Sequence, residues 1–176
     1  MTKRSRKSKA DELWIDLEKA DGSLLDAYIR ATVSKGADSV GKLMAVTYLS
    51  QFEDLTGKFA KNPVYTPDFH VGFIPYSSSL LALLNDVASR GMVSLYSPAE
   101  SELSVRFSSP EDLEGAIEHL VQHGAQLGRL YRANEENLRR HDSRQLFQHV
   151  RECYSRDRHF QSIFDYLDSD NQPDEE

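Results

Sequence analysis

Two histidines, His119 and His123, stand four residues apart in a segment with the apolar periodicity of a helix. Residues four apart lie on one face of a helix, so both imidazoles could bind one metal ion. No third histidine stands beside them, and His141, His149 or His159 would have to be brought to the pair by folding. We therefore expect two surface histidines, and we predict no metal site and no cofactor.

Arg144 and His149 have the arginine-to-histidine spacing of the helical ribonucleases of the HEPN group, which this short segment resembles. The resemblance implies an RNA-cleaving site built on these two residues. Gln145 stands where that group usually has an asparagine or histidine. Positions five apart do not face each other on a helix, and short patterns of this kind arise often by chance. We keep the ribonuclease as an alternative.

Cys153 is the one cysteine of the 176 residues. It excludes an internal disulfide, fits a reducing compartment, and lies on an apolar stripe where a small core residue is expected. The sequence shows no glycine-rich phosphate loop, no nucleophile elbow and no close carboxylate pair in a recognisable frame. We therefore expect a binding module rather than an enzyme.

Charge is unevenly distributed around a formal net charge of −7. The segment 165–176 carries six acidic and no basic residues. Tails of opposite sign are typically solvated, so residues 1–9 and 169–176 are predicted to be disordered. No apolar run approaches the roughly 18 residues of a membrane span, and no secretory signal is present, which predicts a cytoplasmic protein without membrane contact. The basic residues of the first tail are Lys3, Arg4, Arg6, Lys7 and Lys9.

A second group of cations lies between residues 129 and 158, where eight arginines face five acidic residues. Arg132, Arg139 and Arg140, together with the basic tail, are the candidate nucleic-acid-binding residues. Interleaved aromatic residues such as Tyr131 and Phe147 would suit stacking on single strands. The competing interpretation is a solvated helix face with pairs four residues apart.

Apolar periodicity predicts a mostly α fold with a small β-hairpin (α+β). Helices are expected at 11–20, from about 23 to 35, at 40–55, 80–90, 125–140, and from 142 or 143 to about 167. Ser109 and Pro110 predict the start of a further helix that Gly124 ends. Residues 69–73 are expected to be a strand or extended segment, and 92–96 to pair antiparallel with 103–107. We expect one globular domain over 10–168, with the C-terminal helices at 110–167.

A helix followed by glycine and a hairpin is the order of a recognition helix and its wing, so residues 39–107 are predicted to be a winged-helix-like core with flanking helices. The candidate recognition helix offers only Arg90, against Asp86, and the wing turn carries Glu100 and Glu102. Acidic side chains repel phosphates, so this element is not expected to bind a DNA duplex.

The middle region is similar to Panacea-type antitoxins, over about residues 39–107. The similar segments are Gly41-Lys42-Leu43-Met44-Ala45-Val46-Thr47-Tyr48-Leu49, Phe69-His70-Val71-Gly72-Phe73-Ile74-Pro75-Tyr76-Ser77, and the helix from Leu80 that ends at Gly91. Ile74 stands where the family has glycine. The resemblance implies protein–protein binding, such as neutralising a toxin or presenting it to a protease.

We therefore predict an antitoxin- or adaptor-like protein-binding module. Its expected contact residues are Tyr76, Ser78 and Ser79, with the loop around Tyr65. The helix over 146–167 carries an apolar seam that is expected to pack on the protein's own core and is also the best candidate for a homodimer contact. The seam comprises Leu146, Val150, Cys153, Phe160, Phe164 and Leu167.

Overall fold

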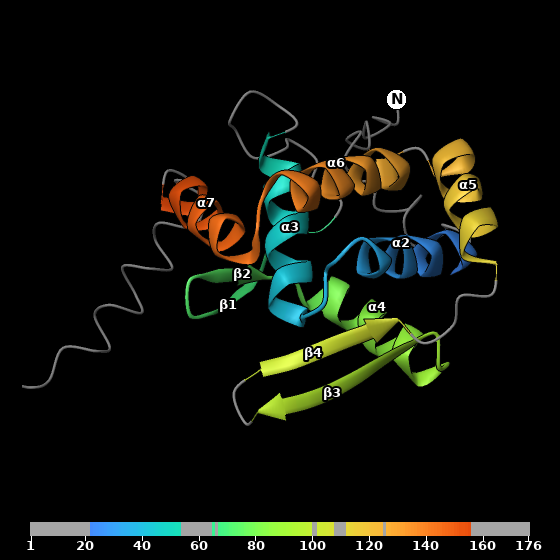
Figure 1. The fold of residues 1–176 in the computed structure, drawn as a ribbon, viewed down its shortest axis with the longest axis horizontal. Coiled ribbons are helices and arrows are strands. Elements are labelled where there is room, and N and C mark those ends of the chain that lie inside the picture. Colours follow the sequence, from blue (N-terminus) through green and yellow to red (C-terminus); the bar gives the residue numbers. More distant parts are fainter. Residues whose placement is uncertain are drawn as a thin grey trace, which may run out of the picture.

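The computed structural model describes residues 22–53, 65, 67–99, 102–107, 112–124 and 126–155. Within these residues the fold is mostly helical with two small antiparallel hairpins, so the predicted α+β class is confirmed (Figure 1). The elements are α2 (Gly22–Ser34), α3 (Val40–Glu53), β1 (Phe69–Val71), β2 (Ile74–Tyr76), α4 (Ser78–Ser89), β3 (Val93–Ala99), β4 (Glu102–Phe107), α5 (Leu113–His123), α6 (Gln126–Arg140) and α7 (Ser143–Ser155). No helix among them is both long and apolar enough to cross a bilayer.

Several predictions concern residues outside the described ranges. These are the helix at 11–20, the tails 1–9 and 169–176, the C-terminal part of the last helix at 156–167, and most of the loop around Tyr65.

Helix α3 is the central element of the fold, because it packs against α6, α7, β2 and β4 (Figure 1). Its residues 43–50 are all buried. Burial on every side is typical of a core helix, and the polar side chains Thr47, Ser50 and Gln51 are buried along with the apolar ones. Helix α2 lies beside it and packs against α4, α5 and α6. The α7 helix and the β1–β2 hairpin lie at one end of the molecule, and α5 lies at the other.

A buried hydrogen-bond network joins α2, α3 and α6. The Tyr28 hydroxyl lies 2.8 Å from Thr47 Oγ1, and Asn134 Nδ2 donates to the same hydroxyl at 2.8 Å. Burial raises the pKa of Tyr28 to about 12, because a phenolate would lose its hydration in the core. Hydrogen bonds between buried side chains help to fix how helices pack, so the bonds of Tyr28 tie the three helices together, although Asn134 Oδ1 has no hydrogen-bond partner among the described residues.

The predicted helix at 80–90 and the hairpin after it are both present. Ser77 caps α4, its side chain accepting from the Leu80 amide, and Val93 of β3 and Val105 of β4 are buried. The hairpin register pairs Leu95 with Val105. The Val105 amide also donates to the Asp38 carbonyl at 2.8 Å, which holds the start of α3 beside β4.

Two predictions about element boundaries are wrong. Residues 69–73 are not one strand, because the chain turns at Gly72 and Phe73 and returns as β2. Helix α5 begins at Leu113 rather than at Pro110, because Asp112 adopts a left-handed conformation with φ of 55° that ends any helix before it. Residues 109–111 themselves lie outside the described part.

The first half of the α7 seam packs within the chain. Leu146, Val150 and Cys153 are buried against a cluster on α3 that includes Val46 and Leu49. These three side chains are therefore not available for a dimer contact. Phe160, Phe164 and Leu167 lie outside the described residues.

Candidate functional site: the hairpin groove

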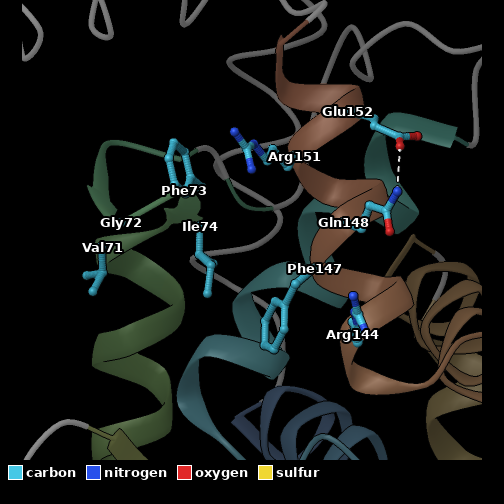
Figure 2. A pocket seen from close by; sticks show the side chains of 9 residues that line it. All are labelled: Val71, Gly72, Phe73, Ile74, Arg144, Phe147, Gln148, Arg151 and Glu152. Atoms are coloured by element: carbon cyan, nitrogen blue, oxygen red, sulfur yellow. Dashed lines mark hydrogen bonds between the residues drawn. The ribbon is translucent and has the colours of Figure 1, made fainter.

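The β1–β2 hairpin and α7 line an open hollow of about 770 Å³ (Figure 2). The hairpin contributes mostly apolar side chains. Helix α7 contributes a phenylalanine ring, a glutamine amide, two arginines and a glutamate. A volume of this size is typical of sites that hold a ligand or an inserted side chain. The lining residues are Val71, Gly72, Phe73, Ile74, Arg144, Phe147, Gln148, Arg151 and Glu152.

A second hollow of about 490 Å³ adjoins the first and shares Val71, Ile74 and Phe147 with it. Its other walls come from the start of α3, from α4 and from β4. We call the two hollows together the hairpin groove. The remaining residues of the second hollow are Val40, Gly41, Phe69, Tyr76, Leu81 and Leu103.

Exposed apolar side chains are concentrated in this groove. Among the described residues, the large hydrophobic side chains that are exposed are Val71 (53%), Phe73 (57%) and Leu103 (42%). All three line the groove. Single exposed hydrophobic residues are ordinary, but a contiguous apolar surface beside a hollow marks an interaction site.

Two glycines allow the hairpin to take this position. Gly72 has φ of +61°, a left-handed conformation that side chains rarely adopt, and it makes the tight turn between β1 and β2. Gly41 lies on α3 beneath the hairpin. A Cβ there would lie 3.3 Å from Ile74 Cδ1, so glycine allows β2 to approach α3 closely.

Helix α7 is held at its start by a reciprocal cap. Asp142 Oδ1 accepts from the Gln145 amide at 2.8 Å, and Gln145 Oε1 accepts from the Asp142 amide at 3.0 Å. This is the arrangement of a capping box, which satisfies amides that the first turn leaves free. The buried seam then faces α3, and the adjacent stripe that contains Arg144, Phe147 and Arg151 faces the groove.

The charged groups of the groove belong to α7. The Arg151 guanidinium carbon lies 4.5 Å from the centre of the Phe73 ring, a cation–π contact from the helix to the hairpin. The carboxylate of Glu152 accepts from Gln148 Nε2 at 3.2 Å (Figure 2). The groove therefore combines apolar walls with two arginines and one acid.

The expected contact residues have different positions in the structure. Tyr76 lines the second hollow, where its ring lies 5.3 Å from that of Phe69. Ser78 and Ser79 are exposed at the start of α4, and neither lines the groove. Their polar atoms bond locally, the Ser78 amide to Asp68 and the Ser79 hydroxyl to Ser77.

Tyr65 is not an exposed contact residue, contrary to the prediction. It is 7% exposed and belongs to the main core. Its amide donates to Gln51 Oε1 and its carbonyl accepts from Gln51 Nε2, both at 2.8 Å. Burial raises the pKa of its hydroxyl above the ordinary tyrosine value. Tyr65 therefore has a structural role.

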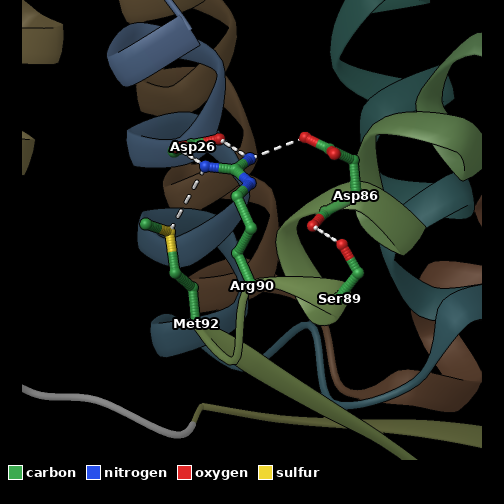
Figure 3. A network of polar contacts seen from close by, with 5 residues as sticks. All are labelled: Asp26, Asp86, Ser89, Arg90 and Met92. Atoms are coloured by element: carbon green, nitrogen blue, oxygen red, sulfur yellow. Dashed lines mark hydrogen bonds and ion pairs between the residues drawn. The ribbon is translucent and has the colours of Figure 1, made fainter.

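Arg90, the one cation considered for the candidate recognition helix, is engaged within the protein. Its guanidinium makes a two-pronged ion pair with Asp26 of α2 and a further contact of 2.7 Å with Asp86 (Figure 3). These carboxylates raise the pKa of Arg90, with the Asp26 hydrogen bond the largest cause. A guanidinium held by two carboxylates is not free to bind a phosphate.

The candidate nucleic-acid-binding residues divide into two sets. Arg139 and Arg140 of α6 both pair with Glu136, at 2.7 Å and 2.6 Å, whereas Arg132 forms no ion pair among the described residues, and all three are exposed. The basic tail residues Lys3, Arg4, Arg6, Lys7 and Lys9 lie outside the described part of the chain.

Four of the histidine candidates lie in two ring pairs, and His159 lies outside the described residues. The rings of His119 and His123 lie 4.9 Å apart, and those of His141 and His149 lie 5.4 Å apart. In the ranges that the structure describes, no three metal-ligating side chains cluster. Arg144 lines the groove and His149 does not.

Sequence patterns alone did not identify most of the groove residues. Val71 and Leu103 belong to apolar alternation, which gives no sign of whether a side chain is buried or exposed. A glycine at the first position of a two-residue turn, here Gly72, is the signal that could have indicated the hairpin.

Comparison with known proteins adds no assignment. The chain matches no protein family model, no curated protein and no solved structure.

Proposed function

We propose that this chain is a non-enzymatic protein-binding module, an antitoxin- or adaptor-like regulator, that holds its partner in the hairpin groove. The observation that carries the proposal is the convergence of Val71, Phe73 and Leu103 on two adjoining hollows. Burial of apolar area is the main favourable contribution in most protein association, so these side chains would supply binding free energy to a partner that covers them.

Two further observations support a protein partner. Eight of the nine residues that line the second hollow lie within 39–107, the region that resembles Panacea-type antitoxins. That resemblance and the winged-helix-like interpretation of the same region are part of this proposal, as is a cytoplasmic location. The ion pairs of Arg90, the residue that directly follows α4, also withdraw this cation from phosphate binding.

The test is a quantitative pull-down from the native host, with mass spectrometry of the captured proteins. The full chain is compared with Val71→Asp and Phe73→Asp, which place a carboxylate on the apolar surface. Both side chains are more than half exposed, so the free energy of unfolding should change little.

Ala82→Asp is the matched control, because Ala82 is exposed on α4 and lines neither hollow. We expect a partner that the wild type and the control both capture and that both groove variants lose. Capture of the same partner in equal amount by all four proteins would refute the proposed site.

A further inference from the structure

The face of α7 that lines the groove has a regular pattern of charge. Arg144, Phe147, Gln148 and Arg151 occupy positions i, i+3, i+4 and i+7, which form one stripe of a helix. Seven residues at 1.5 Å each place the two arginines about 10 Å apart along the axis. The stripe thus presents a cation, an aromatic ring and a second cation to the groove.

Among the described residues, these two arginines form no ion pair, as is also true of Arg129 and Arg132 of α6, but of these four only Arg144 and Arg151 line the groove. Arg139 and Arg140, by contrast, form ion pairs with Glu136. Glu152 is the one acid of the groove lining, and its carboxylate is turned to Gln148 and lies 4.0 Å from His149 Nδ1. Two cations therefore remain for a ligand.

The Phe73 ring holds one of these cations in place. The Arg151 guanidinium carbon lies over this ring, and a guanidinium packed on an aromatic face can still donate from its edge N–H groups to a carboxylate. Stacking also restricts the long side chain before a ligand arrives, which lowers the entropy cost of pairing.

We propose that the groove takes a peptide segment of a partner protein that carries two carboxylates about 10 Å apart with an apolar side chain between them. This inference rests on the proposed function and specifies its partner. The carboxylates pair with Arg144 and Arg151, and the apolar side chain fills the hollow against Phe147 and Ile74. In a helical segment the two acids stand seven residues apart, and in an extended segment three residues apart.

Other ligand chemistries fit less well. A purely apolar segment would desolvate two guanidinium groups without pairing them, which is costly. Arg151 already covers one face of the Phe73 ring, so that face is not open to base stacking. The second hollow is lined by apolar and aromatic residues and glycine, without a cation for a phosphate.

The test is a selection from a displayed library of random 14-residue peptides on the full-length protein. We expect the enriched peptides to carry paired acids around an apolar residue, and to bind the Arg144→Glu/Arg151→Glu variant at least about tenfold more weakly. Their affinity for the wild type should also fall as salt is raised. The charge-reversed variant should itself select peptides with paired basic residues.

Arg129→Glu/Arg132→Glu is the matched control, because both arginines are exposed on α6 and neither lines the groove. It should bind the selected peptides as the wild type does. Enriched peptides that show no bias for acids, or that bind the charge-reversed variant with equal affinity, would overturn the inference. If such peptides nevertheless fail to bind the Phe73→Asp variant, the proposed groove site is supported and only its preference for acids is refuted.

Three further probes decide between occupants. Selected peptides that bind the full-chain variant Asp165→Asn/Asp168→Asn at least about tenfold more tightly than the wild type would assign the groove to this chain's own C-terminal segment. Displacement of the selected peptides by an oligothymidine would assign it to nucleic acid. A dimer in sedimentation that Phe73→Asp dissociates would assign it to a second copy. Any of these three results would overturn the inference, whereas unchanged peptide affinity, no displacement and a monomeric protein support it.

Discussion

At the scale of single residues, the partners of a side chain decide its role more than its type does. Arg90 and Arg151 are both exposed arginines. Arg90 forms ion pairs with Asp26 and Asp86, whereas Arg151 makes a cation–π contact with the Phe73 ring. The first fastens α4 to α2, and the second presents its donors to the groove. In the sequence both residues are arginines, and only the fold shows that their partners differ.

Tyr28 makes stability dependent on pH in the alkaline range. Its pKa is about 12 in the folded protein against 10.0 for an ordinary tyrosine, because burial disfavours the phenolate. A raised pKa in the folded state contributes stability that is fully present below pH 10 and is lost as the pH rises from 10 through 12. The loss should be on the order of 2 kcal/mol for this group.

Urea unfolding followed by circular dichroism at pH 8 to 12 measures this loss. Tyr28→Phe should be less stable at neutral pH by about 1–3 kcal/mol, because Thr47 and Asn134 lose their shared partner. Its stability should nevertheless fall less steeply above pH 10 than that of the wild type. Parallel curves for the two proteins would show that Tyr28 does not carry the dependence.

At the scale of elements, the sequence predicted those elements whose signals are local. Periodicity located α3 and α4, and alternation located β3 and β4 with the register close to that expected. The β1–β2 hairpin was missed because Pro75 and the serines after it indicate the start of a helix. The three-residue strand β2, which includes Pro75, has no sequence signal of its own. Proline is acceptable in β2 because so short a sheet consists of edge strands.

The position of the groove could not be predicted because it depends on non-local packing. Gly41 and Ile74 are 33 positions apart, and their close approach brings the hairpin against α3. The exposure of Val71 and Phe73 likewise follows from the way in which the hairpin leaves the core. The side of α7 that faces the groove could be predicted in part from the sequence, because Arg144, Phe147 and Arg151 share one helical stripe.

The capping box of α7 should stabilise the wall of the groove. Asp142→Ala removes the acceptor of the Gln145 amide and should lower the free energy of unfolding by about 1 kcal/mol. Ser143→Ala, at the exposed neighbouring position, is the control and should change it by less than about 0.5 kcal/mol. Chemical denaturation of both variants measures the difference, and equal stabilities would show that the cap does not hold α7.

At the scale of the whole molecule, the exposed apolar side chains and two arginines without an ion pair among the described residues meet in the groove. The hairpin and α7 lie together at one end of the molecule, whereas Arg90 is paired with Asp26 and Asp86 between α2 and α4 (Figures 1 and 3). A net charge of −7 gives the chain as a whole no general attraction for phosphates. The groove is thus a local exception, with positive side chains beside an apolar surface.

Hydrogen–deuterium exchange of the full chain, with and without the captured partner, tests the groove most directly. We expect slower exchange of amides at 69–76 and 143–152 when the partner is bound, with little change at 126–140. Slower exchange on α6, or at the exposed start of α4, with no change at 69–76 and 143–152, would contradict this expectation.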